Sequence, residues 1–186
     1  SNKDVRALAE SRGDLLTPIV KGWSTEIGQK LTSVGVQIHG GMGFVEETGA
    51  AQYLRDSRIT TIYEGTTGIQ AADLVGRKTL RDGGKAIREL ITDMKETLNS
   101  MNVDDKTLQI IRDSFAQSVE DVESVVDWLL ANTSDPRLVA AAASNYLHLA
   151  GIACGGWLLA RSAVLSVAQL NDGNTDTVFY TAKIDA

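Results

Sequence analysis

The chain has 186 residues, 43% of them hydrophobic, and its 18 Lys and Arg against 24 Asp and Glu give a formal net charge of −6. Proteins that bind nucleic acid carry basic stripes that displace counterions from phosphates, so this acidic chain is not expected to bind nucleic acid. The single cysteine, Cys154, cannot form an internal disulfide, which favours a reducing compartment. We therefore expect a cytoplasmic protein, and we expect no metal site.

Apolar residues recur at steps of three and four, and only two prolines interrupt the chain, so we predict an all-α fold. The first helix is predicted from about Leu15 to His39, with Pro18 in its first turn, where a missing N–H costs little. It ends at Gly40 and Gly41, which readily adopt the left-handed conformation of a helix end. Its apolar face comprises Ile19, Val20, Trp23, Ile27, Leu31, Val34 and Ile38.

Two shorter helices are predicted next. One covers Ala50 to Arg58, and the other begins after Gly65, where Thr66 or Thr67 can serve as the N-terminal cap. The side chains of this second helix that we expect to point inward are Ile69, Leu74 and Val75.

A seam is predicted at Gly83 and Gly84, which separates a helical domain over residues 1–82 from a helical extension over residues 83–186. The extension is interpreted as a second helical bundle of three longer helices. These run from Lys85 to about Asn99, from a cap at Asp104 or Asp105 onward, and from a cap at Ser134 or Asp135, with Pro136 just inside, to about Leu170.

The last long helix contains the apolar stretch LHLAGIACGGWLLA, which raises the question of a membrane span. A span needs about 20 apolar residues, and the stretch between His148 and Arg161 is shorter, so no membrane span is expected. Three small residues, Gly151, Gly155 and Gly156, indicate instead that a neighbouring helix approaches closely.

The glycine-rich segment VQIHGGMGF is the first candidate for chemistry, because such glycines let the backbone approach a phosphate or a flat cofactor. The alternative is a helix C-terminal cap and nothing more. A helix C-terminus carries partial negative charge, so any phosphate contact must come from loop N–H groups or from a side chain such as Gln37. The segment is not a dinucleotide-binding fingerprint, which needs a preceding strand and a following helix N-terminus.

The segment IYEGTTGIQ is the second candidate, since it places Glu64 between an aromatic residue and a glycine, just before a predicted helix. Two interpretations stay open at this point. Glu64 is either a base directed into a pocket or a helix N-terminal acid stabilised by the helix dipole, with Thr66 as the cap.

In combination, these motifs resemble the C-terminal helical segment of the acyl-CoA dehydrogenase family. The resemblance is specific over Val36 to Lys78, extends less distinctively upstream to about Leu15, and continues from about Gly83 as the extra helical domain of longer members. Its elements, in the family's order, are Gln37 with Gly40 and Gly41, the pair Arg55 and Asp56, and YEGT followed by Gln70.

The resemblance implies that Glu64 removes the α-proton of an acyl-CoA thioester while FAD accepts a hydride from the β-carbon, which yields the trans-2-enoyl product. It also implies that the Gly65 backbone lies against the substrate. A carboxylate suits this task only where burial raises its pKa toward neutrality. Ile62 and Tyr63 are the neighbours expected to contribute such surroundings.

The resemblance further implies that two segments contact FAD in a homo-oligomer, with electron-transfer flavoprotein as electron acceptor. The segment that meets the ADP part of an FAD bound mainly by a neighbouring subunit is Gln37, Ile38, His39, Gly40 and Gly41. The segment that approaches the FAD of its own subunit is Thr66, Thr67 and Gly68. His39 is interpreted as a helix C-terminal residue rather than as a base, and Arg55 and Asp56 as residues that orient a loop.

Complete members of the family also have an N-terminal helical domain and a middle β-domain. The chain is therefore expected to be a C-terminal fragment without useful activity in isolation, and its residues do not predict the acyl chain length. Two alternatives stay open: a non-catalytic helical oligomerisation module, and an acyl-CoA oxidase that passes electrons to oxygen.

Overall fold

The computed structural model describes residues 2–101 and 106–186, and every regular element in these two ranges is helical, which confirms the predicted all-α fold. Four elements are short turns of other helix types, with π-helical turns at η1 and η4 and 3₁₀ turns at η2 and η3. In chain order the elements are α1 (Asn2–Ile19), η1 (Val20–Ser24), α2 (Thr25–Ile38), α3 (Gly41–Phe44), η2 (Glu46–Thr48), α4 (Ala50–Arg58), η3 (Ile59–Thr61), α5 (Thr67–Val75), η4 (Gly76–Leu80), α6 (Lys85–Ser100), α7 (Lys106–Ala131), α8 (Pro136–Asn171) and α9 (Thr177–Asp185).

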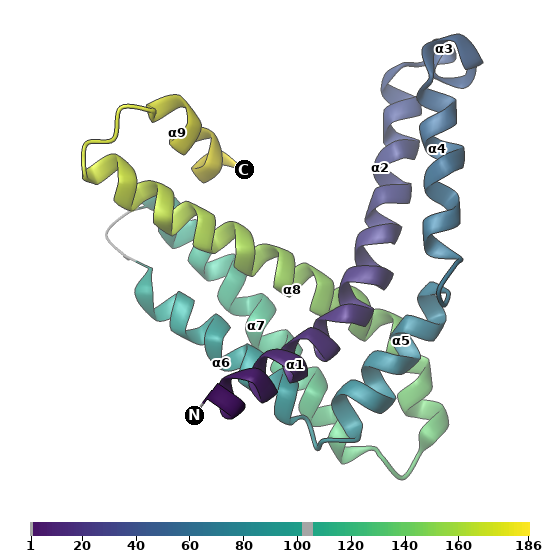
Figure 1. The fold of residues 1–186 in the computed structure, drawn as a ribbon, viewed down its shortest axis with the longest axis vertical. Helices are drawn as coiled ribbons and strands as arrows, with labels where there is room; N and C mark the ends of the chain where they lie inside the picture. The colour runs from purple at the N-terminus through teal and green to yellow at the C-terminus, as the bar shows by residue number, and fades with distance from the viewer. Residues whose placement is uncertain (1, 102–105) are drawn as a thin grey trace.

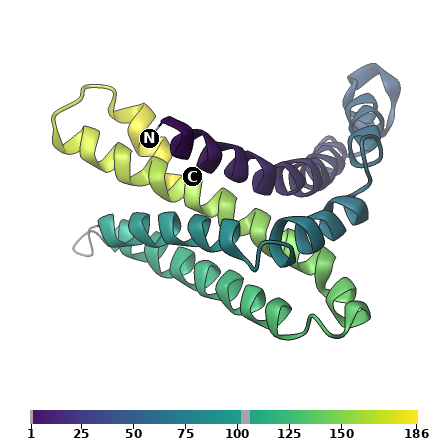
Figure 2. The same cartoon turned by 60° about the horizontal axis from the view of Figure 1, so that its bottom comes forward.

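The molecule consists of a helical body and a projecting hairpin. Helices α2 and α4 form the hairpin, which stands away from the body with the short helix α3 at its tip (Figure 1). In the body, α8 lies between α1 on one side and the pair α6 and α7 on the other (Figure 2). Helix α9 folds back against α8.

In the described part of the chain, the core is a single cluster of buried apolar side chains that extends across the predicted seam. Members from both sides of the seam include Leu15, Leu74, Leu90, Val126 and Leu147. The seam itself is a turn in which Gly83 and Gly84 have φ of 68° and 80°, a region that favours glycine. The division of the chain at residue 82 stays a prediction about domains.

The first predicted helix is longer than expected, because α1, η1 and α2 form one continuous, bent helical segment over residues 2–38. The prediction of a start near Leu15 is therefore wrong, and Pro18 lies inside α1 rather than in a first turn. Proline removes one bond of the helical ladder and crowds the preceding turn. The π-helical turn η1 follows directly, as is common where a ladder is interrupted.

The predicted apolar faces are only partly covered. Leu74 and Val75 are buried as expected, whereas Ile69 is 62% exposed, so the prediction that it points inward is wrong. In the outer half of α2, Leu31 and Ile38 are 62% and 79% exposed. Helical spacing identifies an apolar stripe, but it does not show whether a partner surface lies within the same chain.

The ends of the long helices follow their local signals. Helix α4 has the predicted bounds, and α8 begins at Pro136 after Asp135, whose carboxylate accepts from the backbone N–H groups of Arg137 and Leu138 at 3.1 and 3.2 Å. The predicted cap of α7, Asp104 or Asp105, lies outside the described residues.

Helix α8 packs closely against η1 through two of the predicted glycines. A Cβ added at Gly151 would lie 2.1 Å from Cγ of Trp23, and one at Gly155 would lie 3.2 Å from its Cη2. Close approach is confirmed at these two positions, while Gly156 faces open space. By length and composition α8 is the one helix in the described ranges that would be able to cross a membrane, a test that core helices of soluble proteins also pass.

Candidate active site

Glu64 lies in a backbone turn between η3 and α5 that is held in an unusual conformation. Its φ is +54°, which makes it the one non-glycine residue of the described ranges in the left-handed region, and Gly65 follows with φ +94°. For a residue with a Cβ this conformation costs about 1–2 kcal/mol. Such strain persists where surrounding contacts determine the backbone, and it is frequent at functional sites.

Two side chains hold this turn from different elements. Gln70 of α5 donates from Nε2 to the carbonyl oxygen of Glu64 at 3.0 Å, and Lys21 of η1 donates from Nζ to the carbonyl oxygen of Gly65 at 2.6 Å. Gly65 is required for space as well as for φ, because an added Cβ would lie 3.0 Å from Gln70 Nε2 and 3.3 Å from Ile69 Cγ2.

A groove of about 800 Å³ runs along α1, η1 and α2 and has Glu64 in its wall. Among the described residues that line it, Lys21 and Glu64 carry the only charges, and most of the others are small. The hydroxyl groups of Thr17, Thr25 and Thr32 donate to carbonyl oxygens of their own helical segment, so they are engaged already. The groove thus suits a slender, largely apolar ligand with one polar end near Lys21 and Glu64.

Glu64 itself is exposed, and its two predecessors do not enclose it. Ile62 and Tyr63 are 47% and 49% exposed and do not line the groove. The expectation that they surround the carboxylate with apolar groups is therefore wrong for this chain, because the turn lies at the molecular surface.

The first turn of α5 has an open N-terminal end. Thr66 occupies the capping position in an extended conformation, but its side chain makes no capping hydrogen bond. The hydroxyl of Thr67 instead donates to Glu26 Oε1 of α2 at 2.5 Å, which ties α5 to the hairpin. The first backbone N–H groups of α5, with Gly68 exposed among them, are thus left without a side-chain cap.

The other predicted cofactor segment, residues 37–41, lies at the far end of the hairpin. Helix α2 ends at Ile38, and at a rise of about 1.5 Å per residue its length carries residues 37–41 about 20 Å from its start (Figure 1). The structure therefore brings Glu64 and Gly65 together with residues 66–68, and it does not bring residues 37–41 to them.

The hairpin tip is a glycine turn with an open surface. Gly40 has φ +59°, and a Cβ added at Gly40 or Gly41 would meet nothing within 4 Å. His39 caps the end of α2 with its Nδ1 2.9 Å from the carbonyl oxygen of Gly35, which fits its interpretation as a helix C-terminal residue. Large apolar side chains are uncovered here, with Ile38 79% and Phe44 82% exposed.

Arg55 and Asp56 lie on α4, and Arg55 contacts the loop before it. The Arg55 guanidinium donates to both carboxylate oxygens of Glu46 at 2.8 and 2.7 Å, and these hydrogen bonds lower the pKa of Glu46. Asp56 accepts from Gln52 at 3.3 Å. The contact of Arg55 agrees with a role in orienting the loop between α3 and α4, whereas that of Asp56 lies within α4.

Lys21 is a residue of this site that sequence reasoning did not identify. Its Nζ lies 5.6 Å from the centroid of the Tyr63 ring in addition to contacting Gly65. A lysine on a helix, 44 residues before the glycine that it contacts, carries no local signal of such a role.

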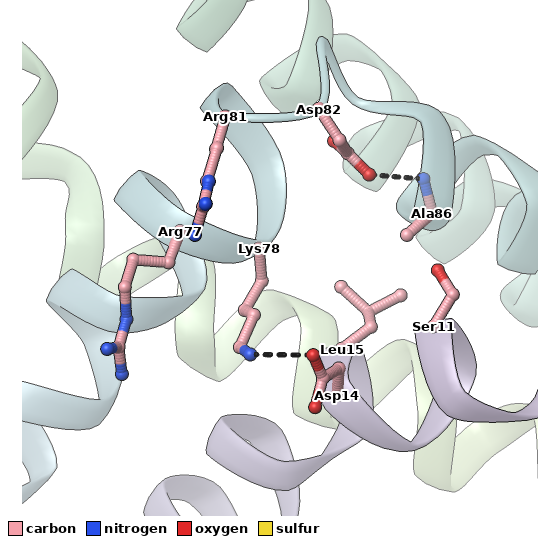
Figure 3. Close-up of a pocket in the computed structure, with 8 residues that line it drawn as sticks. All are labelled: Ser11, Asp14, Leu15, Arg77, Lys78, Arg81, Asp82 and Ala86. Atoms are coloured by element: carbon pink, nitrogen blue, oxygen red, sulfur yellow. Dashed lines mark hydrogen bonds and ion pairs between the residues drawn. The ribbon is translucent and has the colours of Figure 1, made fainter. Parts of the chain in front are cut away.

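A smaller cavity of about 300 Å³ lies between α1 and the start of α6 and is rich in charge (Figure 3). Lys78 reaches across it to Asp14 at 3.3 Å. Asp82 accepts from the backbone N–H groups of Gly84 and Ala86, each at 2.9 Å, so the N-terminus of α6 already has its anion. This cavity is therefore explained as a capped helix start with an ion pair.

No group of three or more His, Cys, Asp and Glu side chains within residues 2–101 and 106–186 is arranged to hold a metal ion. Cys154 is free and half-buried, and burial raises the pKa of its thiol to about 11.

Comparison with known proteins yields matches along nearly the whole chain. A family profile described as acyl-CoA dehydrogenase, C-terminal domain, matches residues 5–79, and one described as acetyl-CoA dehydrogenase C-terminal like matches residues 89–186. The 3-methylmercaptopropionyl-CoA dehydrogenase of Ruegeria pomeroyi is 43% identical over 98% of this chain and 31% of its own length.

Two further relatives are more distant. The broad-specificity linear acyl-CoA dehydrogenase FadE5 of Mycobacterium tuberculosis is 33% identical over 95% of this chain and 30% of its own length. A butyryl-CoA dehydrogenase of Syntrophomonas wolfei is 30% identical over 90% of this chain and 28% of its own length. The chain thus spans roughly a third of the length of the relatives that it matches.

Proposed function

Because this chain belongs to the acyl-CoA dehydrogenase family, we propose that it supplies the catalytic base to an FAD-dependent dehydrogenase that converts an acyl-CoA thioester to its trans-2-enoyl form. The observation that supports the proposal is the clamped, strained turn that holds Glu64 in the wall of the groove. In this proposal the chain is the C-terminal third of the enzyme and has no useful activity alone.

Glu64 takes the α-proton of the thioester on a carboxylate oxygen, and the backbone of Gly65 lies against the bound acyl group. FAD, when bound, supplies the acceptor for the hydride that leaves the β-carbon. Because Glu64 is exposed here, we propose that the remaining two thirds of the enzyme cover the groove and exclude water. Exclusion of water is what brings a carboxyl pKa toward the working pH.

Both predicted cofactor segments fit parts of FAD. The uncapped first turn of α5 at Thr66, Thr67 and Gly68 offers backbone N–H groups and the positive end of a helix dipole to a polar or anionic group. The open backbone at Gly40 and Gly41 leaves room for a flat or extended group.

The separation of these segments supports a homo-oligomer. Residues 37–41 and 66–68 lie at opposite ends of the hairpin, and we propose that they contact FAD molecules of two different active sites. The exposed Ile38 and Phe44 at the tip are suited to burial against a neighbouring subunit. Electron-transfer flavoprotein as electron acceptor, a cytoplasmic location and the absence of a membrane span belong to the same proposal.

The test replaces Glu64 by Gln in the FAD-loaded enzyme that carries this chain, with Glu120→Gln as a matched control on the exposed face of α7. Loss of a general base lowers turnover of butyryl-CoA by about 10²–10⁴-fold, with bound FAD unchanged. Turnover that survives Glu64→Gln at the level of the control would refute the assignment.

A second candidate function is a non-catalytic oligomerisation module, which the exposed apolar tip also favours. It predicts that Glu64→Gln leaves turnover unchanged while Phe44→Ser weakens assembly. An acyl-CoA oxidase is distinguished by oxygen consumption during turnover without an added electron acceptor.

A further inference from the structure

We propose that Lys21 is a positioning residue for Glu64: its ammonium group clamps the Glu64–Gly65 turn and thereby sets the direction of the carboxylate in the groove. This inference rests on the proposed function of Glu64 as base. Lys21 itself is not the proton acceptor, and its role is exerted through the backbone that it holds.

The clamp acts on both sides of Glu64. Lys21 Nζ donates to the carbonyl oxygen of Gly65 at 2.6 Å and lies 5.6 Å from the Tyr63 ring, so it contacts the residues before and after the carboxylate. Gln70 holds the remaining carbonyl, that of Glu64, at 3.0 Å. Both peptide oxygens of a turn with two positive φ angles are therefore engaged by side chains from separate elements.

The backbone that carries Lys21 is held rigidly. It lies in the π-helical turn η1, where a Cβ added at Gly22 would come 2.7 Å from Cδ2 of Leu147 and one at Gly151 would come 2.1 Å from Cγ of Trp23. The two residues that follow Lys21 are thus packed tightly against α8. Single π-turns inside helical segments are frequent at functional sites.

The charge of Lys21 is available to the turn. Within the described residues no carboxylate lies at ion-pair distance from its Nζ, so the carbonyl of Gly65 and the Tyr63 ring are its partners. Hydrogen bonds from a charged donor are shorter and stronger than neutral ones. Lys21 also lines the groove, in which Glu64 is the other charged residue.

The test uses Lys21→Met, which keeps an unbranched side chain one atom shorter but removes its donor and charge, and Lys21→Arg, which keeps both donor and charge. Lys30→Met on the exposed side of α2, outside the groove, is the matched control. In the FAD-loaded enzyme, Lys21→Met lowers kcat for butyryl-CoA by about 10–100-fold, since a misplacement near 1 Å has this effect. KM and FAD content stay as in the control, and Lys21→Arg restores part of kcat.

A second readout is hydrogen–deuterium exchange of the peptide over residues 62–70 in the chain itself. Exchange is faster in Lys21→Met than in Lys21→Arg and Lys30→Met, because the clamp no longer protects the turn. Unchanged exchange, or an unchanged kcat in Lys21→Met, overturns the inference. If Glu64→Gln leaves turnover intact, the proposed function fails instead, and the exchange measurement still decides whether the clamp exists.

Discussion

Trp23 packs tightly against Gly151 of α8, and this contact gives a sharp stability prediction. In Gly151→Ala the new Cβ would lie 2.1, 2.4 and 2.6 Å from three atoms of the Trp23 ring. Ordinary carbon contacts are about 3.5–4.0 Å, so the ring has to move by more than about 1 Å. Gly156→Ala on the same helix meets nothing within 4 Å and is the matched control.

The two substitutions are expected to change the free energy of unfolding in opposite directions. Overpacking a filled site costs about 1–3 kcal/mol, and more where a rigid ring is displaced. Replacing Gly by Ala inside a helix favours the folded state by about 1 kcal/mol. At Gly156 only this second effect operates, so Gly156→Ala is expected to raise the free energy of unfolding while Gly151→Ala lowers it. Because the gain from replacing Gly by Ala in a helix is common to both sites, the two variants should differ by the overpacking cost alone, about 1–3 kcal/mol or more.

Urea unfolding of the chain, followed by far-UV circular dichroism and Trp fluorescence, measures this difference. With a slope of about 2 kcal/mol per molar urea, the midpoints of the two variants should differ by about 0.5–1.5 M. Coincident midpoints would show that the Trp23 ring does not occupy the space beside Gly151, and would remove the packing argument for Lys21 with it.

Two further predictions concern titratable groups. Burial raises the pKa of Cys154 from 9.0 to about 11 and of Tyr146 from 10.0 to about 12, so the folded state keeps protons that the unfolded state releases. The contribution of these two groups to the free energy of unfolding should be constant below about pH 9 and fall as pH rises toward 12, and Cys154→Ala should reduce the loss between pH 9 and 11 in urea titrations. At the loop before α4, Arg55→Gln should raise the lowered pKa of Glu46 toward its ordinary 4.5, which carboxyl NMR titration measures; an unchanged value would mean that the ion pair is absent in solution.

Helix ends that depend on neighbouring residues are predictable from this sequence. The cap at Asp135, the start of α8 at Pro136 and the bounds of α4 all follow from signals within a few positions. The motif around Glu64 is equally local, which is why it identifies the turn without a structure.

Features that depend on distant partners are not predictable in this way. Pro18 in α1 and the π-helical turn after it leave no clear periodic signal, so the first helix is predicted too short. Ile38 and Ile69 lie on apolar stripes but are exposed, because spacing does not reveal whether a covering surface belongs to the same chain. Lys21 contacts Gly65 across 44 residues, a distance at which a single sequence carries no information about contact.

The helical extension has no catalytic motif, yet α8 reaches the candidate site through packing. Its Leu147 and Gly151 fix the backbone of Gly22 and the ring of Trp23, which are the two residues that follow Lys21 in η1. Because packed interiors transmit displacements rather than absorb them, the position of α8 determines where the backbone of Lys21 lies. The geometry of the Glu64 turn therefore depends on the second half of the chain, although every predicted site residue lies in the first.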